Sequence, residues 1–204
     1  MSENFGPADN GTEGDNGLGV SGIGVSGSGV SGTENGLLFG ITDPGPFADE
    51  RTMLLGFLRR QRDLVAWKVA DAPDDVLRSV STATGLTPHG VVRHLTNVER
   101  SWLRHVFADQ DDLSFDWTDD DPDREWKVPS DVTMADLLAA YVAEAERCDL
   151  VIASAASLDQ AAVGRNFSLR WIVNHLIEET ARHLGQLDVL REQADGAVGE
   201  EPEA

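Results

Sequence analysis

Cysteine is nearly absent from this chain, whose 204 residues include only Cys148. A single thiol can form no disulfide within the chain and cannot supply a cysteine-based zinc site. Cys148 also falls among apolar residues with helical spacing. We therefore expect it to be a buried structural thiol and not a catalytic one.

Basic residues and long hydrophobic runs are also scarce. With 36 acidic and 16 basic side chains, the formal net charge is −20, which would repel phosphates and predicts no nucleic-acid partner. No segment approaches the roughly 18 consecutive apolar residues of a transmembrane helix. The N-terminus lacks the basic and apolar regions of a signal peptide. These absences predict a cytoplasmic protein with no membrane partner.

Bulky side chains are scarce in the first 40 residues, where GLGVSGIGVSGSGVSGTENG repeats the unit Gly-Val-Ser-Gly. Such a composition cannot bury enough apolar surface to offset the loss of chain entropy on folding. We expect a disordered, dispensable Gly/Ser-rich tail over 1–44, a folded domain over 45–195, and a disordered acidic tail over 196–204.

The domain contains four segments with helical periodicity and no sustained alternation typical of strands. We expect helices at about 47–70, from 88 to about 107, from 134 past 152, and from 169 to about 194, and therefore an all-α four-helix bundle. Start signals are Thr87 before Pro88, Thr133 with Asp136, and Ser168. The expected apolar stripes are Leu54, Phe57, Leu58, Leu64 and Val65; Val91, Leu95, Val98, Trp102 and Val106; Leu137, Tyr141, Cys148 and Ile152; and Ile172, Leu176, Leu187 and Leu190.

The connection between the second and third helices, 108–132, is long for a helical bundle. Its length predicts a crossover between these two helices, a lid over a pocket, or both. It holds ten acidic and two basic residues together with Trp117 and Trp126. This composition fits a solvated loop anchored by two tryptophans as well as a pocket cover. About nine residues join the last two helices, which we expect to be antiparallel neighbours.

Two polar residues, Glu179 and His183, interrupt the apolar stripe of the last helix. They lie four residues apart, so both side chains face the same way. A buried carboxylate costs several kcal/mol unless it is paired or binds a metal. His94, at the edge of the stripe of the second helix, is the best third ligand. His175, one turn before Glu179, is an alternative ligand or a supporting hydrogen-bond donor.

Two nitrogen ligands and one oxygen ligand leave metal positions open for water or substrate, as in catalytic zinc sites. Nickel, iron(II) or manganese also fit such ligands. The alternative is a metal-free, buried Glu–His pair. Trp102, about two turns beyond His94, and Tyr141 are expected to wall the pocket and bind the cofactor, although both positions also fit a plain core.

Two segments, GLTPHGVVRHLTNVERSWLRHVF and FSLRWIVNHLIEETARHLGQLDVLRE, resemble the DinB-like metal-binding four-helix bundles over about 45–195. The resemblance is strongest to the actinobacterial mini-circle-type branch. The family has a His in its second helix and an H-x-x-x-H motif, commonly continued by R-G-Q, in its last. The matching positions here are His94, Glu179 and His183, followed by Leu184-Gly185-Gln186. Glu179 departs from the commonest pattern but is similar to the His, Glu, His set of mycothiol-dependent maleylpyruvate isomerase.

The resemblance implies a divalent metal, zinc foremost, on His94, Glu179 and His183, and it implies homodimers. Characterised relatives often use a low-molecular-weight thiol: mycothiol, bacillithiol or glutathione. The implied function is a thiol-dependent S-transferase or isomerase in which the metal activates a thiolate that attacks a small-molecule substrate. No separate catalytic residue stands out. The alternatives are a metal-dependent hydrolase that activates water, and a non-enzymatic, metal-stabilised stress-response or binding protein.

Overall fold

The computed structural model describes residues 41–199, and this range is helical. Its elements are α1 (Glu50–Ala70), α2 (Asp74–Arg78), α3 (Pro88–Glu99), the π-helix η1 (Arg100–Phe107), the 3-10 helix η2 (Arg124–Trp126), α4 (Met134–Ser154) and α5 (Leu169–Asp195). Within 41–199 there is no strand, only an isolated antiparallel bridge between Ala161 and Ser168. The predicted all-α class is confirmed. None of the described helices is long and apolar enough to cross a membrane.

The predicted tails lie mostly outside the described residues, so their disorder stays a prediction. Residues 41–44 and 196–199, which are described, form no helix. Asp43 nevertheless pairs with Arg60 on α1, with 2.7 Å between Oδ1 and Nε. At the other end, the Lys68 ammonium group donates to the carbonyl oxygen of Gly199 at 2.5 Å. The short segments that precede the first helix and follow the last one therefore both contact α1.

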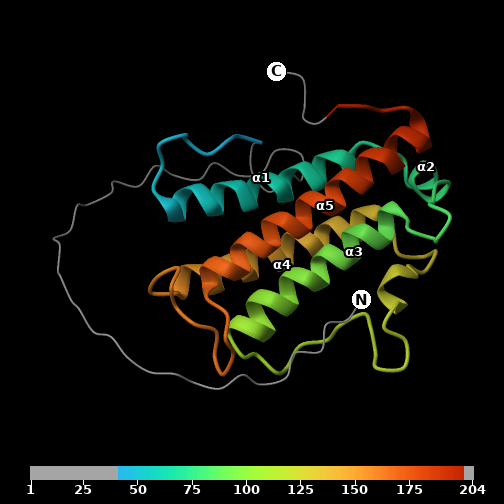
Figure 1. Ribbon diagram of the computed structural model, residues 1–204. Coiled ribbons are helices and arrows are strands. Elements are labelled where there is room, and N and C mark those ends of the chain that lie inside the picture. Colours follow the sequence, from blue (N-terminus) through green and yellow to red (C-terminus); the bar gives the residue numbers. More distant parts are fainter. Residues whose placement is uncertain (1–40, 200–204) are drawn as a thin grey trace, which may run out of the picture. The chain divides into compact units, whose positions relative to one another are not determined.

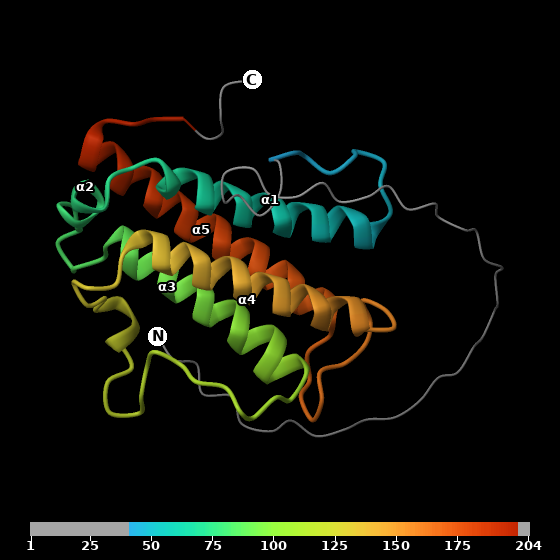
Figure 2. The ribbon, with the colours of Figure 1, turned by 180° about the vertical axis from the view of Figure 1, so that it is seen from behind.

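The four long helices form a bundle in which α1 and α5 run in one direction and α3 and α4 in the other (Figures 1 and 2). Because α3 and α4 are parallel, segment 108–132 must carry the chain back along the bundle, which confirms the predicted crossover. The last two helices are antiparallel, as expected. However, α5 packs mainly against α1 and α3. The connection over 155–168 is longer than the nine residues expected, and this length lets α5 cross to that position.

The predicted helix starts are confirmed by their capping bonds. The side-chain oxygens of Thr87, Thr133 and Ser168 each accept a hydrogen bond from a backbone N–H in the first turn that follows. Thr133 and Asp136 form a reciprocal capping box. Helix α5 ends at Gly196, whose φ of 78° lies in the left-handed region where glycine has no Cβ penalty. Local sequence signals therefore define where these helices begin and where α5 ends.

The core follows the predicted stripes with one correction on α1. Leu58, Leu64 and Val65 are buried, but the Phe57 side chain is 39% exposed. Neighbouring helical residues point about 100° apart, so Phe57 turns away from the face that Leu58 buries. Cys148 is fully buried, as expected, and its Sγ lies 3.5 Å from the carbonyl oxygen of Glu99.

The helix predicted over 88–107 is continuous, but its second half is the π-helix η1. A π-turn closes i→i+5 hydrogen bonds, so each residue turns through a smaller angle than in an α-helix. The directions of the side chains beyond Glu99 therefore differ from those that α-helical periodicity predicts.

Candidate metal centre

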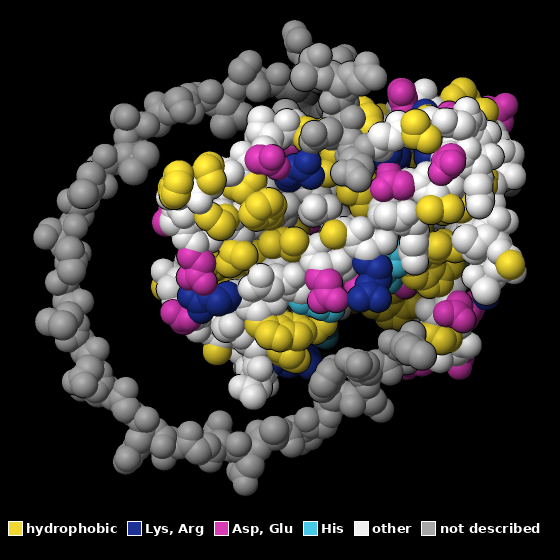
Figure 3. All heavy atoms as spheres, turned by 45° about the horizontal axis from the view of Figure 1, so that its top comes forward, with side chains coloured by type: hydrophobic (Ala, Val, Ile, Leu, Met, Phe, Trp, Pro, Cys, Tyr) yellow, Lys and Arg dark blue, Asp and Glu magenta, His cyan; other side chains and the backbone are white. Residues whose placement is uncertain are grey.

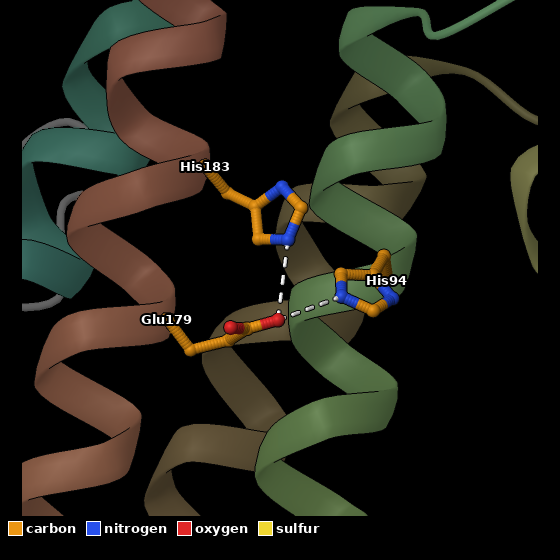
Figure 4. A group of neighbouring side chains, drawn as sticks. All are labelled: His94, Glu179 and His183. Atoms are coloured by element: carbon orange, nitrogen blue, oxygen red, sulfur yellow. Dashed lines mark hydrogen bonds and ion pairs between the residues drawn. The ribbon is translucent and has the colours of Figure 1, made fainter. Parts of the chain in front are cut away.

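The structure brings together His94 from α3 with Glu179 and His183 from α5, as Figure 4 shows. One ligand atom from each residue lies within 4.8 Å of the other two. The Oε1 atom of Glu179 is 3.4 Å from Nε2 of His94 and 3.3 Å from Nε2 of His183. The three residues selected from the sequence thus form one cluster between two helices.

The outer nitrogen of each imidazole is held by an oxygen atom. His94 Nδ1 lies 2.9 Å from Oε1 of Glu125, and His183 Nδ1 lies 2.7 Å from Oε1 of Gln186. A neutral imidazole that donates from Nδ1 keeps its lone pair on Nε2. Both lone pairs then point into the space beside the Glu179 carboxylate. Metal-binding histidines typically have this arrangement, with an oxygen partner on the nitrogen that faces away from the metal.

The spacing of the ligand atoms in the cluster is compatible with a metal ion between them. Ligand atoms about 2.0–2.2 Å from a tetrahedral zinc lie roughly 3.3–3.6 Å from one another. The two contacts to Glu179 Oε1, at 3.3 and 3.4 Å, match that spacing. An optimised charged hydrogen bond would be about 2.7–2.9 Å. The inner contacts are therefore long where the outer ones are short.

Electrostatics prepares Glu179 to act as an ionised ligand. When Nε2 of His183 or His94 carries a proton in place of a metal, it donates to the Glu179 carboxylate, and this hydrogen bonding holds the pKa of the Glu179 carboxyl well below its usual 4.5. Burial by itself lowers the pKa of His94, but the hydrogen bonds to Glu125 and Glu179 outweigh it, and the pKa of His94 lies above 6.5. The side chains of His94, Glu179 and His183 remain 16%, 24% and 10% exposed. The cluster is therefore partly open to solvent.

The crossover segment covers one side of this cluster through η2. The ring of Trp126 stacks on His94, with centroids 4.3 Å apart and an interplanar angle of 25°. Arg93 fastens the segment to α3 by donating to the carbonyl oxygens of Glu125 and Arg124, at 2.5 and 2.7 Å. A Cβ added at Gly90 would lie 3.1 Å from the carbonyl oxygen of Trp126. This close approach favours the pocket-cover interpretation for η2.

Sequence reasoning missed two residues of the centre, Glu125 and Gln186. Gln186 has a signal, because it lies three residues after His183 and ends the H-L-G-Q run of the recognised motif. Glu125 has none, since it is one of many acidic residues in a segment without periodicity. The other tryptophan of the crossover, Trp117, stacks on Phe115 at 4.4 Å.

The remaining candidates lie outside the cluster. His175 stacks on Trp171 and meets Trp102 edge-on, at centroid distances of 5.1 and 4.7 Å, so it belongs to a group of aromatic rings. Tyr141 is fully buried, and its hydroxyl has no hydrogen-bond partner among the described residues. Its burial favours the core interpretation. The cofactor-binding roles expected for Trp102 and Tyr141 stay predictions.

Comparison with known families gives a match over residues 53–196 to the family described as Mycothiol-S-transferase. The matched range includes His94, Glu179, His183 and the whole crossover. A search of curated proteins gives no match.

Proposed function

The chain belongs to the mycothiol-S-transferase family, and from this premise we propose that it transfers a mycothiol-type thiol to a small electrophilic substrate. We further propose that a divalent metal, zinc foremost, is held by His94, Glu179 and His183. Because the reaction needs a pool of reduced thiol, we place it in the cytoplasm. The homodimer implied by the family resemblance stays a prediction.

One observation carries the metal proposal: two imidazole Nε2 atoms and one ionised carboxylate converge on the same partly exposed space. Two neutral imidazoles and one carboxylate leave a divalent cation with a net positive charge. Bound there, such a cation would lower the pKa of a thiol that reaches it, and the thiolate is the reactive form. Glu125 and Gln186 keep both imidazoles in the tautomer that this role requires.

The proposed reaction balances without a further redox partner. The thiolate sulfur forms a bond to an electrophilic carbon, and the bond from that carbon to its leaving group breaks. The leaving group takes the electron pair, and the thiol proton passes to solvent. Trp126 and the packed crossover shield one side of the cluster from water, which favours thiolate attack over hydrolysis.

The test compares metal content with thiol-transfer activity in matched variants. Protein without a polyhistidine tag is stripped of metal, reloaded with zinc, manganese, nickel or iron(II), and assayed for transfer of mycothiol, bacillithiol or glutathione to monobromobimane. We expect activity that requires both metal and thiol. His94→Ala, Glu179→Ala and His183→Ala should lose most bound metal and activity, whereas His175→Ala should keep its metal.

Two results would contradict the proposal. Full metal occupancy in all three triad variants would leave a buried Glu–His cluster without a metal role. Metal-dependent bond cleavage that proceeds equally well without any thiol would indicate a hydrolase.

A further inference from the structure

We propose that the aromatic cluster formed by Trp102, Phe167, Trp171 and His175 is the subsite for the electrophile, and that it takes a neutral, planar aromatic molecule. This inference rests on the proposed function, because it assigns a substrate class to that reaction. It is carried by ring geometry, by the exposure of one ring and by the position of the cluster on α5.

The four rings contact one another and come from two different parts of the chain. Trp102 lies on η1, whereas the other three rings lie at or just before the start of α5. Trp102 is 5.4 Å from Phe167, 5.3 Å from Trp171 and 4.7 Å from His175, measured between ring centroids. Trp171 and His175 are nearly parallel, at 13° and 5.1 Å. These spacings are typical of attractive aromatic pairs.

One edge of the aromatic cluster is open to solvent. Trp171 is 45% exposed, which is unusual for a tryptophan in an aromatic group. It borders a surface hollow of about 370 Å³ lined by Ser168, Arg170, Trp171, Asn174, His175 and Glu178. Figure 3 shows one face of the molecule on which histidine side chains reach the surface beside hydrophobic ones. A flat ligand can therefore lie against the cluster without displacing core residues.

The ring nitrogens of His175 set it apart from the other histidines. His89, His94, His105 and His183 each have a hydrogen-bond partner on a ring nitrogen. Among the described residues, His175 makes ring contacts but no hydrogen bond. Its imidazole is thus held by ring contacts, and it lines the surface hollow beside Trp171.

Helical spacing connects the aromatic cluster to the metal centre. Trp171, His175 and Glu179 follow one another at intervals of four residues, so they form a ridge along one side of α5. Each interval advances about 6 Å along the helix. A ring bound against Trp171 and His175 therefore lies about one to two turns from the carboxylate of Glu179. On the facing helices, Trp102 of η1 lies beside Trp171 and His175, and His94 of α3 lies beside Glu179.

The charges around the hollow favour a neutral ligand. Its one cationic lining residue, Arg170, donates to the carboxylate of Glu50 and also pairs with Asp159. Its one acidic lining residue, Glu178, pairs with Arg182 at 3.1 Å. Since both charges are engaged, the hollow has no spare charge to recognise an anion or a cation. Stacking on aromatic faces is then the dominant attraction.

The chemistry can be followed with chlorodinitrobenzene. The thiolate sulfur bonds to the ring carbon that carries chlorine, the carbon–chlorine bond breaks, and chloride leaves with the electron pair. The thiol proton goes to solvent. The same site can be probed without reaction by dinitrotoluene, which keeps the planar nitroaromatic ring but lacks the leaving group.

The experiment measures dinitrotoluene binding to the full chain by equilibrium dialysis. We expect saturable binding that weakens roughly tenfold in Trp171→Ala and stays within roughly threefold in Trp171→Phe, since phenylalanine keeps a stacking face. His175→Phe should bind like the unaltered chain, and His175→Ala more weakly. Val189→Ala, which changes another exposed apolar residue of α5, is the matched control and should not alter binding.

A kinetic arm separates this inference from the proposed function. In Trp171→Ala we expect a higher KM for chlorodinitrobenzene and an unchanged KM for iodoacetamide, which has no ring. If Trp171→Ala has the same KM as the unaltered chain for each of the two electrophiles, the subsite is overturned and the transferase proposal is left intact. Dinitrotoluene binding to His183→Ala, without thiol transfer by any form of the protein, would support the subsite and overturn only the reaction.

Two further outcomes would overturn the subsite. The first is absence of saturable dinitrotoluene binding to the unaltered, folded chain. The second is a dimer that dissociates in Trp171→Ala, which would show that a second copy covers this surface.

Discussion

Glu125 Oε1 lies 2.9 Å from Nδ1 of His94, which joins the crossover segment directly to the proposed metal centre. The second oxygen of this buried carboxylate accepts a hydrogen bond from Nδ2 of Asn97, also at 2.9 Å. Glu125 is thus held from two sides and in turn fixes the orientation of His94, a proposed metal ligand. We therefore expect the structure of the crossover segment to affect the affinity of the proposed metal site.

Replacing Glu125 should weaken metal binding while leaving the three ligands in place. We expect roughly tenfold lower zinc affinity for Glu125→Gln and up to about a hundredfold for Glu125→Ala, because His94 loses the partner that fixes its tautomer. A competitive titration with a zinc-binding dye measures this. Asp123→Asn, an exposed change in the same segment, is the control. Equal affinity in all four proteins would show that Glu125 does not support the site.

The lone thiol should be inert in the folded protein. Burial, with the nearby charge of Glu99, raises the pKa of the Cys148 thiol well above 9.0, so the reactive thiolate is scarce. We expect a disulfide reagent to label the native chain at least about a hundredfold more slowly than the chain unfolded in guanidinium. Cys148→Ala should retain its bound metal. Fast labelling of native protein would indicate an accessible nucleophile.

His89 should make stability depend on pH. Burial lowers the pKa of His89 below its usual 6.5, although its hydrogen bond to Asp74 acts in the opposite direction. The unfolded chain therefore binds the proton first as the pH falls. The stabilising contribution is fully present above pH 6.5 and is lost as the pH falls towards the folded pKa. Urea unfolding of the unaltered chain and of His89→Gln at several pH values measures how much His89 contributes to the free energy of unfolding. If the free energies of unfolding of the unaltered chain and His89→Gln differ by the same amount above and below pH 6.5, this assignment is contradicted.

Arg62 neutralises a buried carboxylate and should be needed for stability. Its guanidinium donates twice to Glu99, at 2.6 Å each, and both side chains are nearly inaccessible. Arg62→Met should lower the free energy of unfolding by about 3–5 kcal/mol, because it leaves a buried charge without a partner. Adding Glu99→Gln should recover part of this loss.

The control for this prediction is Arg182→Met, which breaks an exposed pair with Glu178. It should change the free energy of unfolding by less than about 1 kcal/mol. If Arg62→Met and Arg182→Met lower the free energy of unfolding by similar amounts, burial does not determine how much an ion pair contributes to stability. Urea denaturation curves supply both values.

Local features of the sequence predicted most of the bundle correctly. Thr87, Thr133 and Ser168 cap their helices as expected, because a capping bond involves only residues within one turn. The triad was also accessible to sequence reasoning. Glu179 and His183 break an apolar stripe within one helix, and His94 lies in the other segment that resembles a known family.

The errors arise where neighbours along the chain do not decide the structure. The apolar spacing on α1 predicts Phe57 in the core, yet its side chain is 39% exposed, because it points about 100° away from the buried Leu58. The last two helices were expected to pack together, but α5 lies mainly against α1 and α3. The π-helical geometry of η1 has no signature in the hydrophobic pattern.

Residues close together in the chain are enough to predict where the helices begin, which faces they bury and which polar residues interrupt those faces. Helical periodicity and capping depend on residues three or four positions apart, so they can be read locally. The contact between His94 and Glu125, which are 31 residues apart, and the ring contact between Trp102 and His175 become visible in the folded domain alone. Such contacts depend on how the long connections close and how the helices pack, and no pattern within a single segment records either.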